Sequence, residues 1–193
     1  MADNVFQTVS MKAGDAQKSY YWYREQVKNL GSNLSGTQLL RNEKLTSSIR
    51  PGEMYLFMYD PKLKKTLPYY DAVPLVLPFR VMTDGFLGIN LHYLPYLARF
   101  NLLGELNKLT LDKRITENTR IQISWQILNS SSKYLAATAC VKHYLTSHLR
   151  SRFLKINYTD WITASMLPVE RFKSDSGNDP SKAKVWRDTS KKI

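Results

Sequence analysis

Cysteine, histidine and long apolar runs are all scarce in this chain of 193 residues, and each absence excludes a class of protein. The single cysteine, Cys140, cannot form an internal disulfide or supply a cysteine-based zinc site, and it fits assembly in a reducing cytoplasm. No run of about 18 apolar residues is present, so we expect no membrane span. The first four residues do not begin a basic stretch followed by an apolar one, so we also expect no secretory signal.

The residue patterns of common catalytic and metal sites are missing as well. His143 and His148 are five residues apart with no acid nearby in sequence, which is not the spacing of a helical zinc site. Cys140 and His143 lie on one predicted helix, whereas a nucleophile and its base usually come from different elements. No glycine-rich phosphate loop occurs, and the acids of the middle segment fall at predicted turns. We therefore predict no catalytic residue, no metal, no cofactor and no small-molecule substrate.

Acidic residues are few and unevenly placed. The chain carries 28 Lys and Arg against 16 Asp and Glu, which gives a net charge of +12 and an isoelectric point near 9.7. A protein this basic attracts polyanions, such as nucleic acid, an acidic protein surface or anionic lipid. No Asp or Glu occurs between Asn118 and Thr159. This acid-free stretch and a predicted turn at 62–65 supply the candidate contacts to nucleic acid or an acidic partner: Arg120, Lys133, Lys142, Arg150, Arg152, Lys155, Lys62, Lys64 and Lys65.

Composition and turn signals predict three parts. Hydrophobic residues make up 43% of the chain, enough to bury a core. We expect an N-terminal helix and arm at 1–50, a core domain at 51–172, and a flexible basic tail at 173–193. Val185 and Trp186 are the only apolar anchors of that tail, so we expect them to dock on a partner protein.

Strand patterns gather between residues 52 and 92. Predicted strands cover 54–59, 73–79 and 86–91, with turn signals between them. Pro74 and Pro78 cannot donate ladder hydrogen bonds, so the middle strand is predicted to be an edge strand or an interrupted one. We expect a small, bent antiparallel sheet or a partial β-barrel.

Helical patterns lie on both sides of these strands. A helix is predicted over 15–30, with Tyr20, Tyr23, Val27 and Leu30 on one stripe. Residues 32–48 are expected to be a mobile arm or a short helix. Further helices are predicted from Pro95 onward and over 117–129, 137–152 and 160–167, with a returning strand at 153–156. Strands followed by helices predict an α+β fold.

Two long motifs carry a resemblance to a known family. The stretch from Gly52 to Pro95 begins Gly-Glu-Met-Tyr-Leu-Phe-Met-Tyr-Asp-Pro-Lys and ends Asp-Gly-Phe-Leu-Gly-Ile-Asn-Leu-His-Tyr-Leu-Pro. With the blocks at 140–153, 161–172 and 185–188, it resembles a family of virion-associated structural proteins of T-even-type and marine myophages. The resemblance implies a phage structural protein of the virion, such as a DNA end protector or neck protein. It implies no cofactor and no catalytic residue.

Three functional hypotheses follow. The first is a non-enzymatic virion protein that contacts packaged double-stranded DNA independently of sequence, so that its binding weakens steeply with salt. The second is an assembly component of the neck, tail or baseplate that binds only protein neighbours, which the many Tyr and Trp residues favour. The third is an enzyme, such as a metal-dependent nuclease or a small-barrel toxin. Charge and resemblance favour the first.

Overall fold

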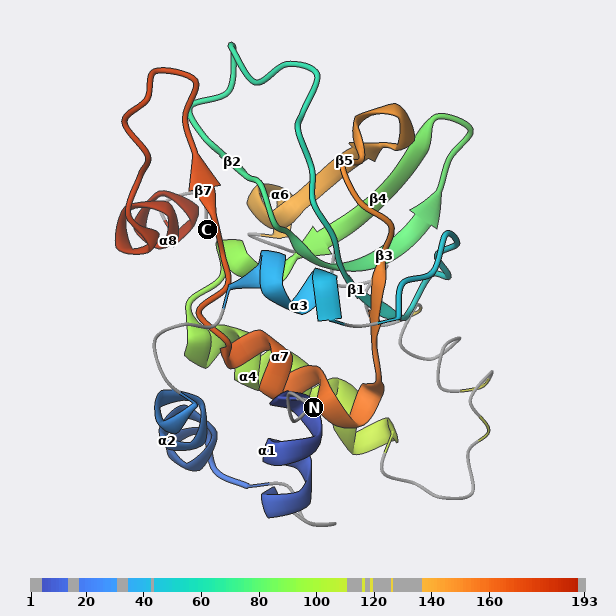
Figure 1. Ribbon diagram of the computed structural model, residues 1–193, viewed down its shortest axis with the longest axis vertical. Helices are drawn as coiled ribbons and strands as arrows, with labels where there is room; N and C mark the ends of the chain where they lie inside the picture. Colours follow the sequence, from blue (N-terminus) through green and yellow to red (C-terminus); the bar gives the residue numbers. More distant parts are fainter. Residues whose placement is uncertain are drawn as a thin grey trace.

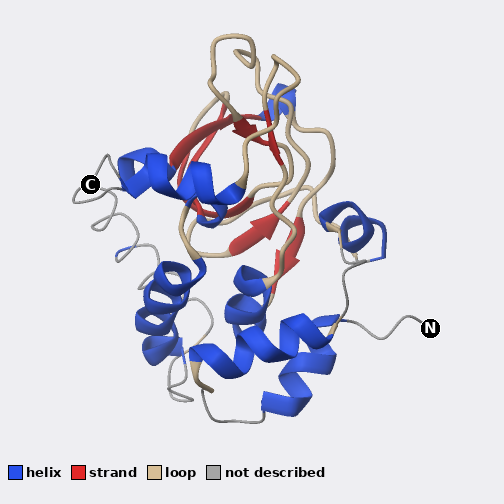
Figure 2. Cartoon of the chain, turned by 90° about the vertical axis from the view of Figure 1, so that its left-hand side faces the viewer, coloured by secondary structure: helices blue, strands red, loops and turns tan. Residues whose placement is uncertain are grey.

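The computed structural model describes residues 5–13, 18–30, 35–42, 44–110, 116, 119, 126 and 137–190. A β-sheet occupies one half of the molecule and helices the other (Figure 1). The helical half contains α1 (Val5–Ala13), α2 (Tyr20–Asn29), α4 (Tyr96–Thr110) and α7 (Trp161–Met166), and α3 (Gly36–Asn42) lies between the two halves. The side view in Figure 2 shows the same division, which confirms the α+β class.

The main sheet has five antiparallel strands in the order β5-β4-β3-β1-β6. They are β1 (Met54–Leu56), β3 (Leu75–Val81), β4 (Gly85–Asn90), β5 (Val141–Leu145) and β6 (Leu154–Ile156). The predicted returning strand is confirmed as β6, which pairs with β1 at the register Tyr55↔Lys155. The sheet does not close, because β5 and β6 are separate edges. Of the two predicted forms, the open bent sheet is therefore the one present.

The position of β3 differs from part of its prediction. It lies between β4 and β1 and is not an edge strand. It is interrupted as predicted, because the register with β4 shifts between Pro78 and Arg80. β1 pairs only with Leu75 and Val76, so Pro78 lies beyond the β1 ladder, where its carbonyl accepts a hydrogen bond from Gly52 N at 2.9 Å. A proline is tolerated in a central strand here because its missing N–H coincides with a bulge.

The predicted helix over 137–152 is wrong. Only α6 (Ala137–Cys140) is helical, and the chain then continues as β5 and the short 3₁₀ turn η2 (Thr146–His148). β5 pairs with β4 over five residues, and glycines on β4 face Lys142 and Leu145 across the ladder. Apolar residues four positions apart over 141–153 predicted a helix. Pairing with β4, a strand that contains glycines, outweighed that local pattern.

Three other helices, α2, α4 and α7, follow their predictions more closely. α2 begins after Ser19, whose hydroxyl oxygen accepts a hydrogen bond from Trp22 N at 3.2 Å. Tyr23 and Val27 of its predicted stripe are buried. α4 begins directly after Pro95, and α7 matches the helix predicted over 160–167. α1 was not predicted, and nearly all of the helix predicted over 117–129 lies outside the described residues.

The C-terminal segment, predicted as a flexible tail, is packed against the rest of the chain as far as residue 190. β7 (Phe172–Lys173) pairs with β2 (Tyr70–Asp71) in a second, two-stranded sheet. α8 (Lys182–Ser190) follows and packs near the 3₁₀ turn η1 (Leu91–Tyr93). The side chain of Val185 is fully buried, so α8 contributes to the hydrophobic core of the chain. The segment is polar in composition, and Val185, Trp186 and a few hydrogen bonds hold its helix against the chain.

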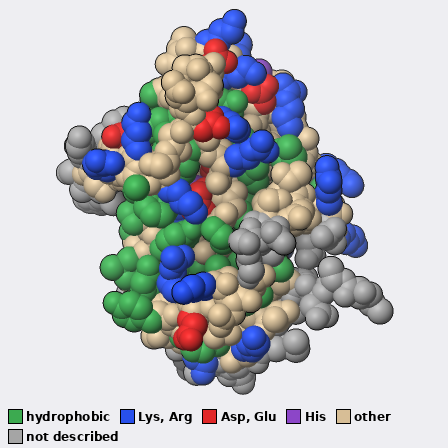
Figure 3. Space-filling view, turned by 60° about the vertical axis from the view of Figure 1, so that its left-hand side comes forward, with side chains coloured by type: hydrophobic (Ala, Val, Ile, Leu, Met, Phe, Trp, Pro, Cys, Tyr) green, Lys and Arg blue, Asp and Glu red, His purple; other side chains and the backbone are tan. Residues whose placement is uncertain are grey.

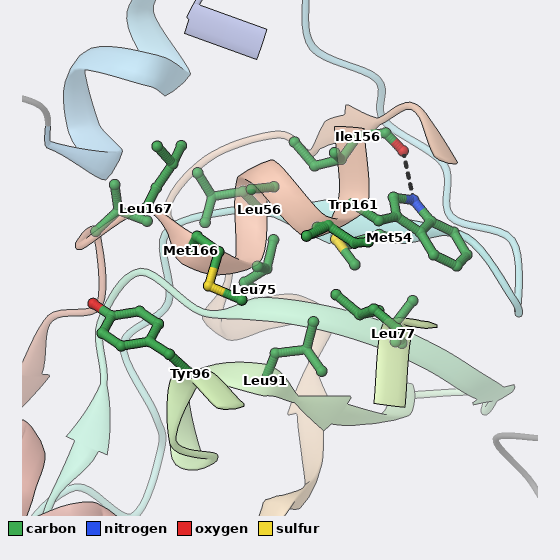
Figure 4. Close-up of a cluster of buried hydrophobic side chains, with 14 of the residues drawn as sticks. Met54, Leu56, Leu75, Leu77, Leu91, Tyr96, Ile156, Trp161, Met166 and Leu167 are labelled. Atoms are coloured by element: carbon green, nitrogen blue, oxygen red, sulfur yellow. Dashed lines mark hydrogen bonds between the residues drawn. The ribbon is translucent and has the colours of Figure 1, made fainter. Parts of the chain in front are cut away.

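Alternate residues of β1 enter two different apolar clusters, as the period of a strand requires. Met54 and Leu56 face the helices, where they meet Trp161 and Met166 of α7 (Figure 4). The 3₁₀ turn η3 (Tyr158–Asp160) leads into α7, and the indole N–H of Trp161 donates to Ile156 O at 3.1 Å. The opposite face carries an aromatic cluster: Tyr55, Phe57, Tyr59, Phe86, Tyr144 and Phe153. Both faces of the sheet are thus covered, which holds its loops in place.

Candidate nucleic-acid interface

Acids from other segments of the chain neutralise several of the predicted cationic contacts. Lys155 on β6 lies beside β1, and its ammonium is 2.7 Å from a carboxylate oxygen of Glu53. Glu53 is itself nearly buried and also accepts the hydroxyl of Tyr55. The stretch 118–159 contains no acid in its sequence, but its surface is not free of acids. Strand pairing brings Glu53, from another part of the chain, against it.

Asp60 has the same effect on two further cations. Its carboxylate accepts from Lys64 at 3.1 Å and from Arg150 at 3.2 Å, so one acid joins the two predicted basic segments. The hydrogen bond from Lys64, together with that from Arg150, holds the pKa of Asp60 below its ordinary value. His148 Nδ1 adds a 2.9 Å hydrogen bond with the carbonyl oxygen of the same residue. The 62–65 tip and the 146–152 turn consequently form one surface with mixed charge.

The other predicted contacts differ in how far their side chains are exposed to solvent. The ammonium of Lys142 lies 4.3 Å from the centre of the Tyr93 ring, a cation–π contact that leaves it half-buried. Lys62, Lys65 and Arg152 are exposed, and no ion pair involves them within the part of the chain that the structure describes. Two further predicted contacts, Arg120 and Lys133, lie outside the described residues.

A second cationic surface, which the sequence did not reveal, lies between α2 and α8. A cleft of about 910 Å³ opens there, and we call it the α2–α8 cleft. Its lining comprises Arg24, Glu25, Val27, Lys28, Tyr96, Pro168, Ser181, Lys182, Ala183 and Trp186. Figure 3 shows this side of the molecule, where Lys and Arg side chains extend from top to bottom and acidic side chains gather mainly in the upper half.

Tyr96 is one of the residues that line the α2–α8 cleft, and cations surround its ring. The guanidinium carbon of Arg24 lies 4.1 Å from the ring centre, and that of Arg99 lies at 4.6 Å. The ammonium of Lys182 is 5.7 Å from the same point. The spacing of Arg24 and Lys28 on one face of α2 was visible in the sequence, but their partner Lys182 is more than 150 residues away. Sequence reasoning therefore missed this surface.

A buried polar network supports the cleft from behind. The Arg99 side chain is fully buried and donates to three carbonyl oxygens, those of Leu94 at 2.7 Å, Ser165 at 2.8 Å and His92 at 3.1 Å. Glu170 is equally buried, and its Oε1 accepts from Lys182 and from the Tyr96 hydroxyl, both at 2.9 Å. These fixed partners hold the cleft side chains in one arrangement.

The predicted interface anchors of the C-terminal segment lie against the chain itself. Val185 is buried in the core, and the indole N–H of Trp186 donates to His92 O at 2.9 Å. The Trp186 ring meets that of Tyr96 edge to face, with centres 5.2 Å apart. In this arrangement both side chains fix α8 to its own molecule, and only Trp186 is left partly exposed, in the α2–α8 cleft.

Of the groups with catalytic potential in the described part of the chain, His92 and Asp71 pair at 2.7 Å, and both side chains are buried. His143 pairs with Asp84 at 3.1 Å, and His148 Nδ1 forms a hydrogen bond with the carbonyl oxygen of Asp60. Burial raises the pKa of the Cys140 thiol to about 11, which disfavours the nucleophilic thiolate. Among the described residues, no three His, Cys, Asp or Glu side chains are grouped to hold a metal ion. None of the described helices is both long and apolar enough to cross a membrane.

Comparison with known proteins gives one match. The family model described as phage T4 terminal DNA protecting protein matches residues 5–189, which include the sheet, both apolar clusters and the two helices of the α2–α8 cleft. No curated protein and no solved structure matches the chain.

Proposed function

The chain belongs to the phage T4 terminal DNA protecting protein family, and from this premise we propose that it binds the ends of linear double-stranded DNA and shields them from exonucleases. It acts as a structural component of the phage particle and catalyses no reaction. The observation that carries this proposal is the extent of the family match, which spans residues 5–189. The net charge of +12 supports it, because DNA is a polyanion.

Contacts to the DNA backbone would supply most of the affinity. Lys62, Lys65 and Arg152 are exposed cations without acidic partners among the described residues, so their charge is available to phosphates. Lys155 and Arg150 each lie against a carboxylate and contribute less. Phosphate contacts carry no sequence information, so binding is expected at any DNA end.

A nuclease-protection assay tests the proposal. Linear duplex DNA is incubated with the purified protein and then with an exonuclease that degrades duplexes from their ends, and the surviving full-length DNA is measured. We expect survival to rise with protein concentration. As a control, the same DNA closed into a circle is treated with an endonuclease, which the protein should not inhibit. Equal degradation of linear DNA with and without protein would contradict the proposal.

A second candidate function, an assembly component of the neck, tail or baseplate that binds protein neighbours, is favoured by the tip of the β3–β4 hairpin. Val81 and Met82 are 55% and 41% exposed there, so two neighbouring apolar side chains are available to pack on a protein partner. Replacing both by serine should lower the amount of the chain in purified particles, measured by quantitative immunoblot, while DNA-end protection is kept. Normal incorporation would exclude this docking role. Removal of 173–193 is a poor alternative test, because it also takes Val185 from the core.

A further inference from the structure

An end of a DNA strand differs chemically from its interior in ways that a flat basic surface cannot detect. Lysines on a convex or flat surface contact internal phosphates as readily as terminal ones. A terminal phosphate is a monoester with up to two negative charges, and the terminal nucleotide has no neighbour on one side. A protein that prefers ends therefore needs a concave site that accepts a chain terminus. The α2–α8 cleft is such a site.

The size of the cleft suits a small ligand. Its volume of about 910 Å³ lies within the range of roughly 300–1,000 Å³ found for small-molecule pockets. The walls come from α2, the start of α4 and the first turn of α8. A nucleotide at a strand end can enter this space, whereas nucleotides inside a duplex are held in the stack by both neighbours.

The charge of the lining favours an anion. Arg24, Lys28 and Lys182 face the cleft, and Glu25 is the single acid among the lining residues. Glu170 neutralises Lys182 in part, at 2.9 Å, which leaves Arg24 and Lys28 as the main source of positive potential. Charge-assisted hydrogen bonds to phosphate are stronger than neutral ones, and an arginine can make two in parallel.

The aromatic groups of the lining suit the rest of a nucleotide. Tyr96 and Trp186 lie edge to face, and their positions are fixed by Glu170 and by His92 O respectively. Rings held in this way lose little freedom when a ligand binds, which favours affinity. Trp186 is the partly exposed ring of the two, because Tyr96 is buried with Arg24 and Arg99 over its ring. Sugars and bases pack on an exposed ring without a requirement for one base.

We propose that the α2–α8 cleft binds the phosphorylated terminal nucleotide of a DNA strand, with Arg24 and Lys28 at the phosphate and Trp186 beside the nucleoside, while Tyr96 holds Arg24 in place. This inference rests on the proposed function and adds the chemical basis on which an end is distinguished from the interior. A 5′-phosphate and a 3′-phosphate share this chemistry, and binding measurements separate them.

The experiment uses the full-length protein and a hairpin duplex with one blunt end. The end carries a 5′-phosphate, a 3′-phosphate or hydroxyl groups only, and the dissociation constant is measured by fluorescence anisotropy. We expect one phosphorylated end to bind about tenfold more tightly than the hydroxyl end, the effect of one charge-assisted contact. Arg24→Gln and Lys28→Gln should each remove most of this preference, whereas Arg24→Lys should keep part of it.

Arg80→Gln is the matched control, because Arg80 is exposed on β3 and lies outside the cleft lining. It removes the same charge and should leave the preference for phosphorylated ends intact. Circular dichroism verifies that each variant is folded.

If the wild-type protein protects ends but binds phosphorylated and hydroxyl ends equally, the role of the cleft is overturned and the proposed function stands. If folded Arg24→Gln and Lys28→Gln proteins keep the preference, the cleft is likewise overturned. If the wild-type protein neither binds nor protects ends, both proposals fail.

Discussion

A single buried carboxylate, that of Asp71, links segments that are far apart in the chain. Its two oxygens accept hydrogen bonds from Asn90 Nδ2 at 3.1 Å and from the backbone N–H groups of Val73 at 3.0 Å and Arg171 at 3.2 Å. The fourth partner is His92 Nδ1, at 2.7 Å. Asp71 thus joins β2 to the end of β4, to η1 and to the residues before β7.

The charged state of Asp71 stabilises the fold. Burial alone would raise the pKa of this carboxyl, but the His92 imidazole and the hydrogen bonds outweigh it and hold the pKa below its ordinary value. The pKa of Glu170 is lowered against its own burial by His92, Arg99 and Lys182. A carboxyl with a lowered folded pKa contributes stability above its unfolded pKa, and that contribution is lost as the pH falls through the folded value.

We therefore predict that unfolding becomes easier in acid. The free energy of unfolding, measured by urea denaturation, should be constant from neutral pH to about pH 5 and fall as the pH drops below about 4. Asp71→Asn should cost about 3 kcal/mol at pH 7, because it breaks a buried pair, and should make the acid dependence shallower. Asp175→Asn, at an exposed acid, is the control and should change neither quantity. An unaltered acid dependence in Asp71→Asn would refute this role.

At the scale of elements, the contact between β4 and β5 depends on glycine. A methyl group at Gly85 would overlap the carbonyl oxygen of Tyr144 on β5, whereas one at Gly88 would overlap a methyl of Val76 on β3. β5 can approach β4 as it does because β4 lacks a side chain at Gly85. This close pairing explains why 141–145 is a strand although its apolar spacing is that of a helix.

Gly85→Ala should separate β5 from β4 locally. We expect a loss of about 3 kcal/mol in the free energy of unfolding, the upper range for overpacking, because the overlap involves backbone and not a flexible side chain. Gly177→Ala provides the comparison, since Gly177 has φ of 80° in open space and should cost only about 1 kcal/mol of backbone strain. Equal stability of the Gly85 and Gly177 variants in urea denaturation would show that the close approach is unimportant.

At the scale of the whole molecule, a large net charge coexists with local neutralisation. The chain has a net charge of +12, yet Glu53, Asp60 and Asp84 each lie against a basic or histidine side chain of the C-terminal third. Surface ion pairs of this kind add little stability. Their main effect here is that positive charge remains at two places. One is the set of exposed lysines and arginines, and the other is the α2–α8 cleft.

This distribution predicts a steep dependence of DNA binding on salt. Each phosphate that a cation neutralises releases condensed counterions, so the logarithm of the binding constant falls linearly with the logarithm of salt concentration. Between about 50 and 200 mM salt we expect a loss of at least tenfold in affinity for a blunt duplex, measured by anisotropy titrations. The combined Lys62→Gln and Lys65→Gln variant should show a shallower slope. Affinity that is independent of salt would mean that phosphates are not the main contact.

The amino-acid sequence by itself determined the α+β class, strand β6, helix α2 with its stripe at Tyr23 and Val27, and the start of α4 after Pro95. These features follow from residue propensities and from periodicity within about a dozen neighbours. Only the tertiary structure decided that 141–145 is a strand, that α8 packs into the core through Val185, and that acids face Lys155 and Arg150. The α2–α8 cleft was beyond the sequence for the same reason: its residues come from both ends of the chain, and folding alone brings Arg24 and Lys182 to one tyrosine ring.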